Sequence, residues 1–256
     1  MAGRTWEPSE IERPRFTVIA GSGFRPEFFD FDRGIRVGNL EPHERITQIL
    51  KRALESAFGQ TFTTVRWGRG VYWQWIGFFP QANRLAKPLS HHVSFGCAKY
   101  FISLERDDNC VKAGMQVERG YLRAPRQYPE CRLREDWDWH RLLAQLRSGS
   151  ELDHLLRQLV TVDGFHIYAG GWPDGEELTA ARFTGATQVR RLLLSAPSTQ
   201  WGGFQLYYPM TQNDVRSMTG YEIVESILAI FGEVTPVLNR CMQIRLQPCS
   251  RHGGGD

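Results

Sequence analysis

The clearest structural pattern of this 256-residue chain lies in residues 99–121, KYFISLERDDNCVKAGMQVERGY. Apolar side chains alternate with other residues on both sides of Asp107-Asp108-Asn109, which is the period of a β-strand with one buried face. The stretch predicts a β-hairpin with strands at Lys99–Arg106 and Cys110–Tyr121. A hairpin of this length in the middle of the chain favours an antiparallel sheet as the centre of the fold.

A second hairpin is predicted upstream, where Thr61–Trp67 and Val71–Phe79 flank Gly68-Arg69-Gly70. Both segments are rich in β-branched and aromatic residues, which strands favour. Alternate residues of a strand share a face, so Trp73 and Trp75 are expected to point to the same side of the sheet.

Helical spacing of apolar residues appears in four longer segments: about Pro42–Phe58, Asp136–Arg147, Glu151–Val160 and Gly220–Phe231. Thr235-Pro236 predicts the start of a separate last helix, Val237–Met242, because Thr caps helices and Pro suits their first turn. Two further strands are expected, at Phe165–Ala169 and Phe204–Tyr208, whereas Thr187–Leu194 fits either a strand or a helix. These blocks predict an α+β fold: a mostly antiparallel sheet built from central hairpins, flanked by N-terminal, middle and C-terminal helices.

The chain has no long Ser/Gly/Pro linker and no internal repeat, which favours one α+β domain over residues 16–247 with tails at 1–15 and 248–256. No run approaches 18 apolar residues and the polar start lacks a secretory signal, so we expect no membrane association. Five scattered cysteines without a CxxC pair favour a reducing compartment. A cytoplasmic protein is expected.

The composition is unusual in its arginines. Basic residues number 31 and acidic residues 28, for a formal charge of +3, and Lys occurs at only four positions, so 27 of the basic residues are Arg. The chain also has 8 Trp, 8 Tyr and 15 Phe. Arg and aromatic side chains stack on planar ligands, and Arg binds phosphate in bidentate fashion.

Several common chemistries have no matching motif. The chain lacks a P-loop, a Rossmann GxGxxG, a GxSxG elbow, an HExxH pair and zinc-finger Cys/His spacing. No Lys stands two residues after an acidic residue, the spacing of a common metal-dependent nuclease core. The sequence therefore predicts neither a metal site nor a cofactor.

The aromatic hairpin is the first candidate ligand-binding segment. It brings together Arg66, Trp67, Arg69, Tyr72, Trp73 and Trp75. Aromatic residues interleaved with Arg form stacking platforms for bases. The alternative, which the frequency of Trp in central hairpins favours, is that these aromatic side chains fill the core.

The second candidate segment follows the other hairpin, where two prolines indicate a surface loop. Its candidate residues are Arg119, Tyr121, Arg123, Arg126, Arg132 and Arg134. Such a loop is suited to binding phosphates or carboxylates. The alternative is a solvated loop whose charge is balanced by the following acidic residues.

Candidate catalytic residues are few. Asp136 and His140 lie four residues apart and would share a helical face, as a base oriented by a carboxylate would require; His166 is a further candidate base. Acidic residues in a first helical turn also complement the helix dipole without any catalysis. Glu105 and Glu118 could face each other across the hairpin, where a salt-bridge ladder with Arg is the commoner arrangement.

These features favour a binding module that recognises a nucleic acid, a nucleotide-like molecule or another phosphorylated ligand. The hairpin would stack on a base and the Arg-rich loop would hold phosphate. One alternative is a small hydrolase or transferase that uses a His/carboxylate pair. Another is a protein-interaction subunit whose aromatic side chains belong to the core.

Overall fold

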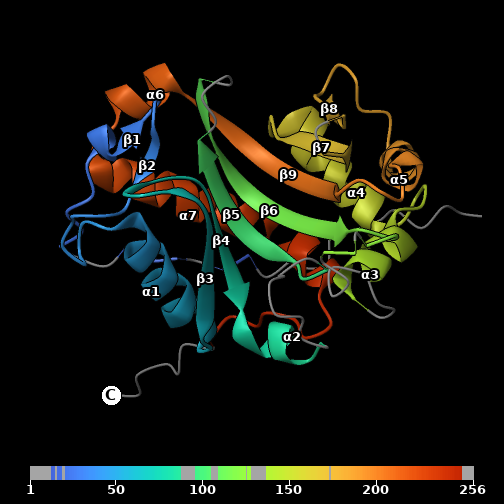
Figure 1. Cartoon of the computed structure of the whole chain (residues 1–256), viewed down its shortest axis with the longest axis horizontal. Helices are drawn as coiled ribbons and strands as arrows, with labels where there is room; N and C mark the ends of the chain where they lie inside the picture. Colours follow the sequence, from blue (N-terminus) through green and yellow to red (C-terminus); the bar gives the residue numbers. More distant parts are fainter. Residues whose placement is uncertain are drawn as a thin grey trace, which may run out of the picture.

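The computed structural model describes residues 13–14, 16–18, 21–87, 96–104, 109–124, 126–127, 137–172 and 174–249. They form seven α-helices and one nine-stranded sheet in which adjoining strands are antiparallel (Figure 1). The predicted α+β class is confirmed. No helix among the described residues is long and apolar enough to cross a membrane.

The sheet is built around the two predicted hairpins, which are β3–β4 and β5–β6. The spatial order is β1-β2-β4-β5-β6-β9-β7-β8, and β3 pairs with β4. The strands are β1 (Phe29–Asp30), β2 (Gly34–Arg36), β3 (Phe62–Arg69), β4 (Tyr72–Pro80), β5 (Lys99–Leu104), β6 (Cys110–Gly120), β7 (His166–Gly171), β8 (Glu176–Leu178) and β9 (Gly202–Thr211). Because β2 pairs with only the first residues of β4, β5 pairs with the rest.

The α-helices are α1 (Ile46–Phe58), α2 (Gln81–Leu85), α3 (Asp138–Gln145), α4 (Glu151–Arg157), α5 (Ala186–Ser195), α6 (Gln212–Ser217) and α7 (Gly220–Cys241). Of these helices, α1, α3, α4 and α7 lie in predicted segments with shifted ends, α5 lies in the ambiguous segment, and α2 and α6 were not predicted. A 3-10 turn, η1 (Pro26–Phe28), precedes β1, and a π-helical turn, η3 (Gln158–Val162), continues α4. The ambiguous segment 187–194 is helical because Val189 and Leu193, four residues apart, bury one face.

The predicted break before Pro236 is wrong, because α7 runs through it as one helix of 22 residues. Pro236 cannot donate a backbone hydrogen bond to Gly232, and its ring crowds that turn. The preceding residue, Thr235, donates its hydroxyl to the carbonyl of Phe231 at 2.6 Å. Buried side chains on both sides of the proline keep the helix continuous, since their burial outweighs one missing hydrogen bond.

The hydrophobic core lies between α7 and one face of the sheet, called the core face. Figure 1 shows α7 running behind β5, β6 and β9. Tyr100 of β5 stacks on Phe231 of α7 with ring centres 4.7 Å apart. The alternate residues of β5 and β6, among them Lys99 and Gln116, lie on the opposite face, called the second face.

A buried ionic cluster joins α2, α3 and the segment after α7. Asp138 accepts from the amide of Asn83 at 2.8 Å and pairs with the Lys87 ammonium at 3.0 Å. The backbone N–H groups of Ala98 and Gln243 also donate to the Asp138 carboxylate. Burial raises the pKa of Asp138, against the opposing effect of Lys87 and these hydrogen bonds. The cluster is structural, because each of its charges is paired.

Candidate functional site

The turn of the β3–β4 hairpin is held in place by its neighbours. Backbone N–H groups of Val37 and Gly38 donate to the carbonyl of Val71 at 2.9 and 3.2 Å, and the Gln74 amide donates to the carbonyl of Arg33 at 3.1 Å. A Cβ atom on Gly68, whose φ is +155°, would lie 2.5 Å from the Trp73 Cα. The sequence Gly-Arg-Gly therefore allows a close turn that the β1–β2 segment then supports.

A β-bulge in this hairpin separates its tryptophans. Trp67 opposes Trp75 and the next residue, Gly68, opposes Trp73, so Gln74 is an extra residue on β4. An extra residue interrupts the alternation of side chains. Trp75 reaches the second face, whereas Trp73 packs against the hydrophobic core. The expectation that Trp73 and Trp75 share a face is wrong for this reason.

The tip of the hairpin carries exposed cationic residues and an exposed aromatic residue. Trp67 is 70% exposed, the most of any large hydrophobic side chain among the described residues, and Arg66 and Arg69 on either side are exposed too. The Arg66 guanidinium carbon lies 3.7 Å from the centre of the half-buried Trp73 ring, a close cation–π contact. We call these four residues, together with Tyr72, the hairpin patch.

Tyr72 adds a second cation–aromatic contact to the patch. Its ring lies 5.5 Å from the guanidinium carbon of Arg33, which in turn pairs with Asp30 at 3.7 Å. Arg33 is therefore partly neutralised. Within the described part of the chain, neither Arg66 nor Arg69 forms an ion pair. The unpaired positive charge of the patch is carried by the two arginines that flank Trp67 in the sequence.

Trp75 belongs to a different group, a polar network on the second face. Its indole N–H donates to the Gln116 side chain at 2.9 Å, and the Gln205 amide donates to the same oxygen at 3.2 Å. Gln116 and Gln205 are buried. Trp75 is thus half-buried and hydrogen-bonded to the sheet. Less of its ring surface is available to a ligand than of the Trp67 ring.

Glu118 accepts hydrogen bonds on the second face from partners that the sequence analysis did not connect. Its carboxylate accepts from the buried Lys99 ammonium and, at 3.2 Å, from the Trp201 indole N–H. The expected cross-strand partner, Glu105, lies outside the described residues. Lys99 and Glu118 lie on neighbouring strands on one face, so strand alternation was the signal that could have connected them.

Arg119 is the last residue but one of strand β6 and is buried, rather than belonging to a surface loop as expected. Its guanidinium donates to the carbonyls of Ala196, Pro197 and Gln200 at 3.0, 2.6 and 2.7 Å. Burial lowers its pKa. Arg119 therefore bonds the turn before β9 to β6, and its guanidinium is not available to a ligand.

The remaining residues of the Arg-rich segment differ in exposure. Tyr121 is half-buried and packs edge-on against Trp201, with ring centres 5.4 Å apart. Arg123 and Arg126 are exposed. Arg132 and Arg134 lie outside the described residues. Among the described arginines of this segment, Arg123 and Arg126 are thus the two that an external phosphate can reach.

The hairpin patch and the Arg123–Arg126 segment lie at opposite ends of the sheet. Figure 1 shows the β3–β4 turn beside β2, whereas the arrowhead of β6 points toward α3. In register, Trp75, Ser103 and Lys112 are opposite one another on β4, β5 and β6. At roughly 3.3 Å per residue, the start of β4 and the end of β6 are separated by about 35 Å. A single nucleotide cannot contact both.

The candidate catalytic residues are also separated. His140 is exposed on α3, and Asp136 lies outside the described residues. His166 of β7, in contrast, contacts a carboxylate: its Nδ1 lies 3.0 Å from Glu177 Oε1 of β8. The Tyr207 hydroxyl of β9 donates to the same oxygen. Sequence reasoning found His166 but missed its two partners, because each comes from a different strand.

The charge of this His166 constellation is set by its hydrogen bonds. Burial opposes ionisation of Glu177, but the bonds from Tyr207 and His166 outweigh it and hold the pKa of Glu177 below its usual value. The Lys112 ammonium lies 5.1 Å from the centre of the Tyr207 ring. An ionised Glu177 would accept the Nδ1 proton of His166 and leave Nε2 as the acceptor.

Among the described residues, no three His, Cys, Asp or Glu side chains are grouped closely enough to hold a metal ion. Comparison with protein-family models, with curated proteins and with solved structures gave no match.

Proposed function

We propose that this protein binds single-stranded nucleic acid or nucleotide-like ligands, and that the hairpin patch is the surface that contacts the base. The observation that carries the proposal is the exposure of Trp67 between Arg66 and Arg69 on a braced turn. The hydrophobic surface of a large exposed indole is removed from contact with water only when a partner covers it. A base has the planar shape to do so.

The energies support this assignment. Stacking of a base on an aromatic side chain contributes about 1–3 kcal/mol. Two arginines without an ion pair among the described residues can each neutralise one phosphate of the bound strand. The turn is hydrogen-bonded to β2 and its flanking residues, so little ordering of the hairpin opposes binding. Arg123 and Arg126 would add phosphate contacts only for a longer strand.

The test is a titration of fluorescein-labelled single-stranded DNA and RNA of about 12 nucleotides, followed by anisotropy at about 50 mM salt. Wild-type protein should bind both, more weakly as salt increases. Arg66→Ala/Arg69→Ala should weaken binding and reduce the slope of log affinity against log salt by about 1.4, because two phosphate contacts are lost.

The matched control is Arg190→Ala/Arg191→Ala, which makes the same change in net charge at two exposed positions on α5. This variant should bind like the wild type. If both double variants weaken binding equally, attraction is a general effect of charge and the hairpin patch is not the site. No binding at about 50 mM salt would reject the nucleic-acid proposal.

A second candidate function is favoured by one observation, the hydrogen-bonded His166, Glu177 and Tyr207. In a hydrolase or transferase, Glu177 would orient His166 as a general base. His166→Gln should then abolish turnover of activated esters such as p-nitrophenyl acetate, whereas His140→Gln should not change it. Turnover that persists in His166→Gln would contradict this role.

A further inference from the structure

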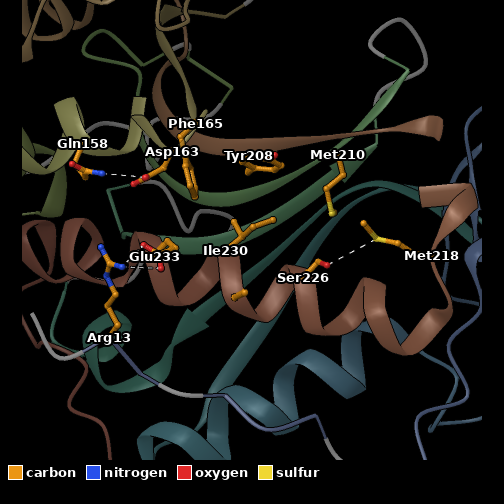
Figure 2. A pocket seen from close by; sticks show the side chains of 11 residues that line it. Arg13, Gln158, Asp163, Phe165, Tyr208, Met210, Met218, Ser226, Ile230 and Glu233 are labelled. Carbon is orange, nitrogen blue, oxygen red and sulfur yellow. Dashed lines mark hydrogen bonds and ion pairs between the residues drawn. The ribbon is translucent and has the colours of Figure 1, made fainter. Parts of the chain in front are cut away.

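A groove with a volume of about 610 Å³ lies between α7, the end of η3 and strand β9. Figure 2 shows its two ends: Arg13, Asp163 and Glu233 gather at one, and Met210 and Met218 at the other. The volume is in the range of small-molecule sites. The groove is formed on the core side of the sheet, remote in sequence from the hairpin patch.

One stripe of α7 forms the floor of the groove. Ser226, Ile230 and Glu233 recur at helical spacing and all line it. Phe165 and Tyr208 form the opposite wall, packed edge-on with ring centres 5.5 Å apart. The wall is therefore aromatic and the floor changes from apolar to acidic toward the C-terminal end of α7.

The acidic end already holds a guanidinium. Arg13 lies 3.0 Å from both carboxylate oxygens of Glu233, with half of the Arg13 side chain exposed. Asp163 accepts a hydrogen bond from the Gln158 amide at 3.1 Å. Burial raises the pKa of Glu233, and the negative charge of Asp163 raises it further. Two carboxylates thus face one arginine, so the charge of the lining favours another cation.

We propose that this groove binds a small organic cation, an amine or guanidinium carried on an aromatic or alkyl body. Glu233 and Asp163 would hold the cationic group, while Phe165, Tyr208 and Ile230 would cover the apolar body. Arg13 is then an intramolecular competitor that a ligand displaces from Glu233. The proposal is independent of nucleic-acid binding at the hairpin patch.

Displacement of Arg13 is energetically feasible. A half-exposed ion pair contributes only about 0–1 kcal/mol, because water solvates both partners. A ligand that brings its own cation replaces that pair and in addition buries apolar surface against Phe165 and Ile230. The face of an aromatic ring such as Tyr208 also attracts cations. An anion of the same shape would meet the two carboxylates and be repelled.

The experiment compares 4-phenylbutylamine with 4-phenylbutyrate, which has a similar body and the opposite charge. Binding is followed through the methyl signals of ¹³C-labelled Met210 and Met218, each assigned by its Met→Leu variant. The amine should shift both signals, and the acid should shift neither. Glu233→Gln should weaken the amine about tenfold, whereas Arg13→Ala should strengthen it several-fold by removing the competitor.

The control is Glu225→Gln, which makes the same charge change at an exposed position of α7 that does not line the groove. It should leave binding of the amine unchanged. Equal binding of acid and amine, or an unchanged affinity in Glu233→Gln, would overturn the proposal. Weaker binding in Arg13→Ala would overturn the competitor role, because Arg13 would then be part of the site.

Discussion

The chain places arginine beside aromatic residues in two regions, and the structure uses the two in opposite ways. In the hairpin patch, Arg66 is exposed and its guanidinium lies over the Trp73 ring, and the next residue in the sequence is the exposed Trp67. At the end of β6, Arg119 is buried and its guanidinium donates to three backbone carbonyls near Trp201. The same residue types form a surface in one region and an internal cross-link in the other.

The difference lies in the partners of the guanidinium. A ring face satisfies none of the N–H donors of Arg66, which stay available to phosphate oxygens. Backbone carbonyl oxygens of the turn at residues 196–200 accept the N–H donors of Arg119, which are therefore unavailable to a ligand. Composition alone does not distinguish an arginine that binds a ligand from one that is structural. Substitution distinguishes them, because loss of the first should change binding and loss of the second should change stability.

The largest expected effect is on stability. Arg119→Ala should lower the free energy of unfolding by about 3 kcal/mol, since it removes a large buried side chain and three hydrogen bonds, one of them to the carbonyl of the buried Ala196. Urea denaturation followed by tryptophan fluorescence measures the change. Arg123→Ala, an exposed neighbour, should change stability by no more than about 0.5 kcal/mol. If Arg119→Ala is as stable as Arg123→Ala, the contrast between the two regions fails.

The next effect is on binding. Trp67→Ala should weaken the single-stranded oligonucleotide about tenfold, the equivalent of about 1.4 kcal/mol of lost stacking. Its stability should stay within about 0.5 kcal/mol of the wild type, because the side chain is exposed. The matched control is Trp172→Ala, which removes an exposed indole elsewhere. Equal losses in the two variants would mean that Trp67 is not a specific platform.

A smaller effect separates the shape of Arg66 from its charge. Arg66→Lys keeps the charge but loses the planar guanidinium that lies over Trp73. We expect about threefold weaker binding with an unchanged salt dependence, because the number of neutralised phosphates stays the same. Anisotropy titrations at several salt concentrations measure both quantities. Wild-type affinity in Arg66→Lys would show that only the charge matters.

The sequence predicted the framework better than the details of the site. Alternation identified both hairpins, because apolar core residues recur at every second position of their strands, although β5 is buried on both faces. It placed Trp73 on the wrong face, since a bulge depends on how two strands pair and leaves no local pattern. It ended the last helix at Pro236, although burial on both sides keeps α7 continuous.

Contacts between distant strands were the least accessible to prediction. The partners of His166 come from β8 and β9, and those of Arg119 lie some 80 residues further along the chain. Nothing in the local pattern around either residue indicates them. Exposure of Trp67 was equally undetermined, because strand alternation gives which residues share a face and not whether a second layer covers that face.

The smallest expected effect tests whether the two ends of the sheet cooperate. Arg123→Ala/Arg126→Ala should leave the affinity for a strand of about four nucleotides unchanged, because these arginines lie about 35 Å from the hairpin patch by strand geometry. A strand of about twenty nucleotides spans that distance, so its affinity should fall about twofold to fivefold and its salt slope by about 1.4.

A loss that is the same for both lengths would place the loop at the primary site and remove the distinction between the exposed arginines of β3 and those that follow β6. An unchanged affinity at both lengths would confine recognition to the hairpin patch, with Trp67 as its only large exposed aromatic side chain among the described residues of that turn.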